Sequence, residues 1–352
     1  MGVQCSEVTG VAFVSHIVLC LLIPLKFLPF ASVNNSMDQS LPSQILQYAL
    51  AEKLGENRVG EIYQAWDSTM ERIVVLRLVP AELSSNRVFR TQCLSTLRTM
   101  AGMAHANIGG VFSATEVDGK LVIVLEYIPG TTLKEMIASG PLDNVEFLRI
   151  AIPIIRGLKY AHEHGIVHGN IRPSNIIIAE DGVVKLMDFG LSLHIVEESL
   201  SSIDTDLRVV RYRSVEHVLN SDITPTSDIF SIGAVFWELL TSKPAFVGNS
   251  VQEIEDAILN GRLDFNLLYT KYKLPGDTVL LLENLLARKP DDRFSSTNEL
   301  LVTLEAMQSF EEGNATRTFF HVRPSTPRQY LLLSLLAVLM VILWLVLTTV
   351  GR

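Results

Sequence analysis

Two short motifs combine residue types and spacing that could handle phosphate groups. Gly55 and Gly60 have four residues between them and stand between two predicted strands. A glycine at such a place lets the backbone approach a bound phosphate closely. The second motif, Asp188-Phe189-Gly190, lies much later in the chain. Each motif is weak alone, because a plain hairpin would explain the glycines and the second motif occurs by chance in many proteins. Their meaning depends on the surrounding elements and on the order of other motifs.

Residues 45–310 form one block without repeats, and this block must position the two motifs. Its predicted elements are mostly strands before Gly130 and mostly helices after it. Before that point, alternating patterns predict strands at Tyr48–Leu54, Glu61–Asp67, Ile73–Val79, Val111–Glu116 and Leu121–Tyr127. A helix is predicted around Arg87–Met103. After Gly130, a helical period predicts helices at Val145–His162, Ser227–Leu240, Val251–Asn260 and Thr278–Leu286. A small β-rich lobe followed by a larger helical lobe indicates an α+β fold with a cleft between the lobes.

The composition argues against some classes of function. The 352 residues carry a formal net charge of −9, so we expect no nucleic acid as a partner. Of the three cysteines, only Cys93 lies in the predicted globular region. A lone thiol supplies no disulfide framework and is typical of a reducing compartment.

Further motifs occur in an order and at spacings that resemble the eukaryotic-like (Hanks-type) serine/threonine protein kinase family, across residues 47 to about 310. After the glycine-rich hairpin come Val74-Val75-Leu76-Arg77, His105-Ala106-Asn107-Ile108, Leu125-Glu126-Tyr127-Ile128, Ile166-Val167-His168-Gly169-Asn170-Ile171-Arg172-Pro173-Ser174-Asn175, Asp188-Phe189-Gly190, Arg213-Ser214-Val215-Glu216, Ser227-Asp228-Ile229-Phe230-Ser231-Ile232-Gly233 and Arg293. The resemblance implies a bilobal protein-kinase-like fold, with an N-terminal lobe at 47–128 and a C-terminal lobe at 129–310.

The resemblance also implies where ligands and supporting residues lie. Arg172 falls in the catalytic loop, and the metal-ligand positions are Asn175 and Asp188. The nucleotide-binding positions are Gly55, Gly60, Ile62, Val75, Glu126, Ile128 and Ile177. The structural positions are the pair Glu216 and Arg293, Asp228 as a brace of the catalytic loop, and His168 as a packed residue between the lobes.

Two catalytic positions depart from the family's pattern. Asn170 stands where the family has the aspartate that accepts the substrate proton, and an amide cannot take up a proton at neutral pH. Losing a general base typically costs about 10²–10⁴ in rate. Arg77 stands where the family has a lysine that contacts the nucleotide phosphates, and a planar guanidinium does not replace a compact ammonium there.

The elements around these two positions depart as well. The sequence contains no Asp or Glu between Glu82 and Glu116, so the helical glutamate that holds the family's lysine is absent. Gln92 and Thr96 are the candidate replacements. The middle glycine of the hairpin is Asn57, which is expected to lift the loop or block it.

These departures favour a membrane-anchored pseudokinase that acts as a scaffold or allosteric binding module for protein partners. Two alternatives stay open. One is a low-activity or unconventional serine/threonine kinase that transfers the γ-phosphate of ATP to protein Ser or Thr, which the intact Asp188 and Asn175 favour. The other is a protein head for membrane tethering with an empty cleft. The sequence is compatible with weak binding of ATP with Mg²⁺ and also with no cofactor.

The two hydrophobic ends predict contacts with a membrane. Residues 330–350 run without a charge. As a helix that rises about 1.5 Å per residue, they would span about one bilayer core. We expect a single transmembrane helix there, a linker at 311–329 and the kinase-like domain on the cytoplasmic side. Residues 1–46 form an N-terminal hydrophobic segment of uncertain role. For its residues 1–36 a second membrane contact, acylation near Gly2 and Cys5, and a translation start at Met37 all stay open.

Overall fold

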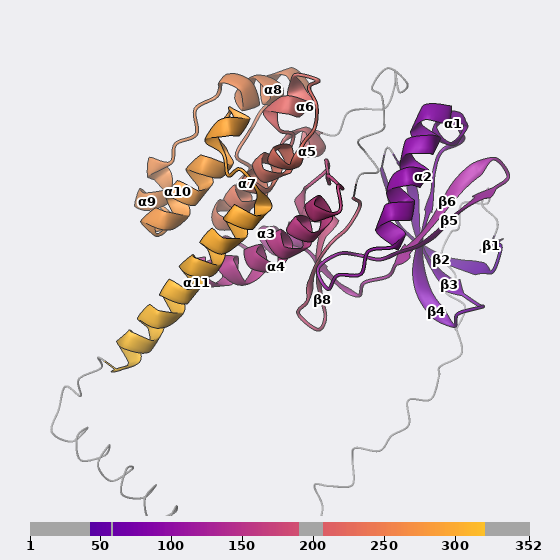
Figure 1. Ribbon diagram of the computed structural model, residues 1–352, viewed down its shortest axis with the longest axis horizontal. Helices are drawn as coiled ribbons and strands as arrows, with labels where there is room; N and C mark the ends of the chain where they lie inside the picture. Colours follow the sequence, from indigo (N-terminus) through magenta and orange to yellow (C-terminus); the bar gives the residue numbers. More distant parts are fainter. Residues whose placement is uncertain (1–42, 58, 190–206, 321–352) are drawn as a thin grey trace, which may run out of the picture. The chain divides into compact units, whose positions relative to one another are not determined.

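A six-stranded antiparallel sheet forms the first lobe of the protein (Figure 1). The structure is a computed structural model that describes residues 43–57, 59–189 and 207–320. The strands follow the order β1-β2-β3-β4-β6-β5. Their bounds are Gln44–Ile45 (β1), Tyr48–Asn57 (β2), Gly60–Asp67 (β3), Arg72–Leu78 (β4), Val111–Val117 (β5) and Lys120–Glu126 (β6).

One helix, α2 at Arg87–Ala101, packs on this sheet through a single apolar stripe. Asn86 caps its first turn by accepting hydrogen bonds from the backbone N–H groups of Val88 and Phe89. The buried residues of the helix recur every three or four positions at Phe89, Cys93, Leu97 and Met100. Three of them join Val75, Ile123 and Leu125 in one buried cluster. This packing fixes α2 against the neighbouring strands β4 and β6.

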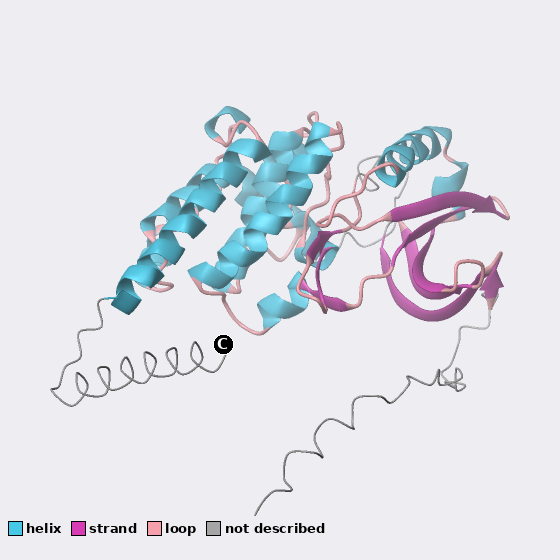
Figure 2. Cartoon of the chain, turned by 60° about the horizontal axis from the view of Figure 1, so that its bottom comes forward, coloured by secondary structure: helices cyan, strands magenta, loops and turns pink. Residues whose placement is uncertain are grey.

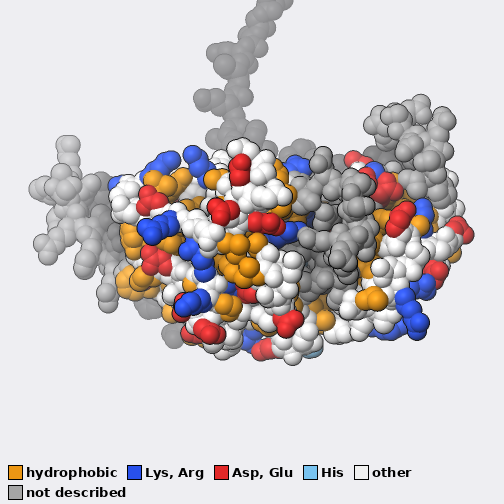
Figure 3. Space-filling model, turned by 90° about the horizontal axis from the view of Figure 1, so that it is seen from above, with side chains coloured by type: hydrophobic (Ala, Val, Ile, Leu, Met, Phe, Trp, Pro, Cys, Tyr) orange, Lys and Arg blue, Asp and Glu red, His pale blue; other side chains and the backbone are white. Residues whose placement is uncertain are grey.

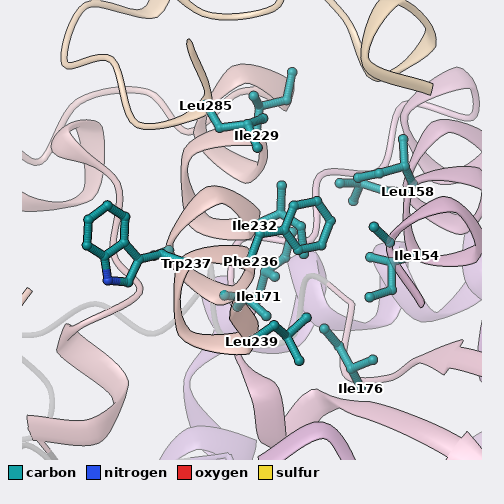
Figure 4. Close-up of a cluster of buried hydrophobic side chains, with 14 of the residues drawn as sticks. Ile154, Leu158, Ile171, Ile176, Ile229, Ile232, Phe236, Trp237, Leu239 and Leu285 are labelled. Atoms are coloured by element: carbon teal, nitrogen blue, oxygen red, sulfur yellow. The ribbon is translucent and has the colours of Figure 1, made fainter. Parts of the chain in front are cut away.

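The second lobe is helical (Figure 2) and is built around α7, Pro225–Thr241. This helix is buried on almost all sides, which its nearly continuous apolar sequence explains. It packs against α4, Asn144–Glu163, where Phe236 meets Phe147 edge to face at 5.0 Å. Figure 4 shows Ile232 and Phe236 of α7 facing Ile154 and Leu158 of α4.

The remaining helices are one short helix of the first lobe and several helices of the second lobe. Their bounds are Ala81–Ser85 (α1) in the first lobe, and Leu133–Ala138 (α3), Leu207–Val210 (α5), Val215–Val218 (α6), Val251–Asn260 (α8), Asn266–Thr270 (α9), Gly276–Leu285 (α10) and Thr297–Phe320 (α11) in the second. On the face seen in Figure 3, acidic and basic side chains are interspersed.

A small three-stranded sheet links the two lobes. Its strands are Gly130–Thr132 (β7), Ile176–Ala179 (β8) and Val184–Leu186 (β9). Leu186 exchanges backbone hydrogen bonds with the segment before β5: its N–H donates to Asn107 at 3.0 Å, and its C=O accepts from Gly109 at 2.8 Å. The chain that leaves β9 is therefore held beside the first lobe, and it carries Asp188.

The predicted α+β architecture, with a β-rich first lobe and a helical second lobe, is confirmed. The predicted strands and helices lie within about three residues of the observed ones. Helix α11 continues to Phe320, so residues 311–320 of the expected linker are helical. It packs along α4, where Asn144 donates to Glu311 at 2.7 Å.

Within the described ranges, no helix is both long enough and apolar enough to span a bilayer. The expected transmembrane helix at 330–350 and the alternatives for residues 1–36 lie outside those ranges.

Candidate functional site

A buried ion pair lies at the centre of the candidate site. Arg77 is on β4, where it pairs with Ile62 of β3 and Ile123 of β6. Its Nη2 donates to both carboxylate oxygens of Asp188, each at 2.7 Å. The two side chains are 2% and 10% exposed. The resemblance placed Arg77 at the family's lysine position and Asp188 at a metal-ligand position, and the structure joins these two positions to each other.

The surroundings of Asp188 keep its carboxylate ionised. Burial by itself would raise the pKa of this group, but the charge and hydrogen bond of Arg77 outweigh burial and lower it. The charge of Arg172 lowers the pKa further. The backbone of Asp188 has φ of 65°, in the left-handed region that non-glycine residues rarely adopt. The ionised carboxylate of Asp188 can bind a cationic group, and the guanidinium of Arg77 is already bound to it.

The second metal-ligand position, Asn175, also contacts an arginine. Its Oδ1 accepts a hydrogen bond from Arg172 Nε at 3.2 Å, and its Nδ2 donates to the C=O of Asn170 at 2.9 Å. The backbone C=O of Asn175 accepts from Met187 N at 2.8 Å, next to Asp188. Asn170, Arg172, Asn175 and Asp188 are thus brought together.

The four residues do not offer the oxygen cage that magnesium requires. Mg²⁺ needs oxygen ligands in near-octahedral geometry at about 2.0–2.1 Å. Here the oxygens of Asp188 face the guanidinium of Arg77, and Oδ1 of Asn175 faces that of Arg172. A cation could bind these oxygens only by displacing the arginine donors. In the part of the chain that the structure describes, no cluster of three or more His, Cys, Asp or Glu side chains provides another metal site.

Asp228 holds the catalytic loop in place. Its carboxylate is fully buried and accepts from the backbone N–H of His168 at 2.7 Å, from that of Gly169 at 2.8 Å and from His162 Nε2 at 2.8 Å. Burial would raise the pKa of Asp228, but the hydrogen bond and charge of His162 help to lower it. The loop that presents Asn170 is therefore well supported, although an amide stands at its centre.

Two further contacts match the structural roles that the sequence predicted. His168 is fully buried and stacks on Phe189, with ring centroids 4.4 Å apart. Burial lowers the pKa of His168. Glu216 and Arg293 form a buried bidentate pair at 2.7 and 3.0 Å. Burial opposes ionisation of Glu216, but the hydrogen bond from Arg293 keeps its pKa low.

The thiol of Cys93 is the side chain of helix α2 that lies near Arg77. Gln92, one candidate replacement for the missing glutamate, is exposed, and Thr96 is half-buried. Cys93 is fully buried and close enough to Arg77 to respond to its charge. Burial raises the pKa of the thiol to about 11, partly offset by that charge. The sequence analysis missed this neighbour, although the helical spacing of Phe89, Cys93 and Leu97 could have revealed it.

The glycines of the β2–β3 hairpin serve different purposes. Gly60 has φ of 130°, and a Cβ added there would lie 2.0 Å from the C=O oxygen of Leu78 on β4. Only glycine fits, and the reason is the packing of β3 on β4. A Cβ at Gly55 would meet no atom within 4 Å. The structure therefore gives Gly60 a role in the fold and leaves space beside Gly55.

The predicted nucleotide-binding residues fall into separate groups. Val75 lies on β4 opposite Leu125 of β6, and Ile62 packs against the same buried cluster. Ile177 lies on β8, where it pairs with Thr132 of β7. Ile128 follows β6 and is 8% exposed. The first group lines the sheet of the first lobe, and Ile177 belongs to the linking sheet.

Glu126, the remaining predicted nucleotide contact, connects the lobes through its side chain. Its two carboxylate oxygens accept from Lys185 Nζ of β9 at 2.7 and 2.9 Å. One of them also accepts from the backbone N–H of Gly110 at 2.9 Å. Sequence reasoning missed Lys185, because a lysine on a short strand carries no motif.

None of the predicted site residues lines the cavity of about 400 Å³ that opens between α2 and β5. This cavity has an apolar floor that includes Leu94, Leu97 and Leu121. Its rim contains Arg90 and Glu116, which form an ion pair. The cavity is separate from the group around Arg77.

Comparisons with known proteins agree with this architecture. A probable serine/threonine-protein kinase of Streptomyces coelicolor is 29% identical over 277 residues, which cover 77% of this chain and 41% of that relative. The probable kinase PknB of Lactococcus lactis is 31% identical over 210 residues, covering 59% and 34%. The kinase PknH of Mycobacterium tuberculosis is 26% identical over 296 residues, covering 84% and 47%. The chain spans half or less of the length of these relatives.

The chain also matches a whole family of domains. Residues 48–304, well over half of the chain, match the protein kinase domain. This range begins at β2 and ends inside α11, so it includes both lobes and the whole candidate site. The chain therefore belongs to the protein kinase domain family and is homologous to bacterial serine/threonine protein kinases.

Proposed function

We propose that this chain is a membrane-anchored pseudokinase, which acts on protein partners as a scaffold or allosteric binding module. The observation that carries the proposal is the buried pair between Arg77 and Asp188. In a kinase, metal ions neutralise the developing charge on the transferred phosphate. Here the aspartate at that position is neutralised by a side chain of the protein itself.

The catalytic loop supports the same proposal. Asn170 cannot serve as a general base, and it stands on a loop that Asp228 holds rigidly. Helix α2 has no acidic residue to draw Arg77 away from Asp188. These changes lie on three separate elements, so a single rearrangement does not restore all of them.

A second candidate is a serine/threonine kinase of low activity. The names of the relatives favour it directly, since each of the three is a serine/threonine-protein kinase or a probable one. Asp188 and Asn175 are both present, and the catalytic loop is braced by Asp228. In this candidate Arg77 would have to release Asp188 to a metal ion during each turnover.

Phosphate transfer from radiolabelled ATP separates the two candidates. The full chain is incubated in detergent with Mg²⁺ and a mixture of Ser- and Thr-containing acceptor proteins. The matched control is Asp188→Ala. We expect equal, background incorporation for both proteins. Incorporation that is well above background and is lost in Asp188→Ala would establish the kinase candidate and overturn the proposal.

A further inference from the structure

Both oxygen groups that the protein kinase family uses for metal ions accept hydrogen bonds from arginines in this chain. Asp188 accepts twice from Arg77 Nη2 at 2.7 Å, and Asn175 Oδ1 accepts from Arg172 Nε at 3.2 Å. We propose that the two guanidinium groups take the place of the divalent metal, so that this site binds the phosphates of a nucleotide without Mg²⁺. The inference deepens the proposed function and rests on it, because the exchange of metal for arginine removes the usual route to transfer.

The groups around the site disfavour a further cation. The oxygens of Asp188 and Asn175 already accept hydrogen bonds from the guanidinium groups of Arg77 and Arg172. Asn170 and Asn175 are neutral, and His168, whose pKa burial lowers, adds no stable positive charge. A divalent cation would add two more charges beside two guanidiniums, where like charges repel strongly in a poorly solvated place. A phosphate would meet complementary charge instead.

The accessibility of the two arginines suggests an order of contact. Arg172 is half-buried, whereas the side chain of Arg77 is 2% exposed. A phosphate would therefore meet Arg172 first. Arg77 would join when the phosphate competes with Asp188 for its guanidinium. Among the described residues, Nε of Arg77 is buried without a hydrogen-bond partner, so this side chain has an unused donor.

The test uses the thermal stability of the full chain in detergent, with ATP as the probe. Tm is measured with ATP in EDTA, with ATP in Mg²⁺, and with Mg²⁺ alone. We expect ATP at saturation to raise Tm by about 5 °C in EDTA. The rise in Mg²⁺ should be no larger, and Mg²⁺ alone should leave Tm unchanged. A rise that requires Mg²⁺, or no rise with ATP in EDTA, overturns the inference.

Two variants assign the effect to these residues. Arg172→Gln should lose most of the rise in EDTA, whereas the matched change Arg156→Gln, on a half-exposed pair with Glu305, should keep it. Asp188→Asn should lower Tm of the free protein, because Arg77 loses its partner, and should enlarge the rise with ATP in EDTA. Loss of the rise in EDTA in Asp188→Asn would show that ATP binding needs the Asp188 carboxylate rather than a released Arg77, and would overturn the inference. If Asp188→Asn does not fold, the comparison of Arg172→Gln with Arg156→Gln still decides.

The Tm test of ATP binding and the phosphate-transfer test of the proposed function can fail independently. Binding is read from Tm without turnover, and the proposed function is read from the transfer of labelled phosphate. Binding that depends on Mg²⁺ without transfer would overturn the inference and leave the pseudokinase proposal standing. Transfer of phosphate would overturn the pseudokinase proposal whatever the effect of EDTA.

Discussion

At the scale of single residues, the contacts of Arg77 show why its chemistry could not be read from its position alone. A guanidinium offers several donors in a planar fork, and Nη2 here reaches both oxygens of Asp188. A buried charge without its partner is strongly destabilising, because the free-energy cost of its desolvation is then not offset. The pair therefore couples β4 to the segment after β9.

We expect Arg77→Leu to destabilise the protein by about 3–5 kcal/mol, because it leaves the buried carboxylate of Asp188 without a partner. The double variant Arg77→Leu/Asp188→Leu should recover most of this loss, since two apolar side chains need no partner. Urea unfolding of the single and double variants measures the coupling. The exposed pair Arg156 and Glu305 is the control and should change stability by at most about 1 kcal/mol. Equal losses in the single and double variants would contradict the coupling.

Cys93 gives a second prediction at this scale. Its thiol is fully buried and its pKa is raised to about 11 by burial, so little thiolate forms near pH 8. In a background that carries Cys5→Ser and Cys20→Ser, a thiol reagent should label the folded protein at least about 100-fold more slowly than the urea-unfolded protein. Labelling is followed by absorbance or mass. Similar rates would show that α2 opens readily from the sheet.

At the scale of elements, the sequence predicted those strands and helices that have a long periodic pattern. The apolar stripe of α2 and the nearly continuous apolar sequence of α7 each indicate one type of packing. The short strands β7 and β9 contain three residues each, too few for a periodic pattern. Their existence depends on backbone pairing with β8.

The hairpin glycines allow a matched test of element packing. Gly60→Ala should destabilise the protein by about 1–3 kcal/mol or more, because its Cβ would overlap the C=O of Leu78 at a positive φ. Gly55→Ala should stay within about 0.5 kcal/mol, because its Cβ would meet no atom within 4 Å. Chemical denaturation measures both variants. A larger loss for Gly55→Ala than for Gly60→Ala would contradict the hairpin geometry.

At the scale of the whole molecule, the fully buried His168 and the half-buried His217 connect folding to pH. The ring of His168 lies against Phe189, and its backbone N–H donates a hydrogen bond to Asp228. Nδ1 of His217 accepts a hydrogen bond from the backbone N–H of Ser214, and its Nε2 contacts the C=O of Gly169 at 3.1 Å. Burial lowers the pKa of both histidines below the usual 6.5. The unfolded chain therefore binds protons at these positions at a pH where the folded protein does not.

We expect the free energy of unfolding to decrease as pH falls below about 6.5, through the lowered pKa values of the folded histidines. Urea midpoints at pH 7.5 and 5.5 measure the effect. His217→Gln should make the dependence shallower, and the exposed His164→Gln should leave it unchanged. A midpoint that is the same at both pH values would contradict the role of His168 and His217.

Membrane attachment is a further prediction at this scale. We propose that residues 330–350 anchor the protein, because they form an uncharged apolar run of bilayer length. A chain shortened after residue 329 should move to the supernatant after alkaline extraction of membranes. A chain that lacks residues 1–36 should stay in the pellet. The reverse result would place the anchor at the other end.

The sequence by itself determined the fold class, the order of the lobes and the positions that depart from the family, because these follow from periodicity and from residue identity. The resemblance to the kinase family assigned Asn170, Arg172, Asn175 and Asp188 to one site. The tertiary structure decided the partners: Arg77 with Asp188, Cys93 near Arg77, and Lys185 with Glu126. Arg77 and Asp188 are 111 residues apart in the sequence, and Glu126 and Lys185 are 59 residues apart. Arg77 and Cys93 are 16 residues apart. Such contacts carry no local pattern, since only the packing of the folded chain brings the partners together.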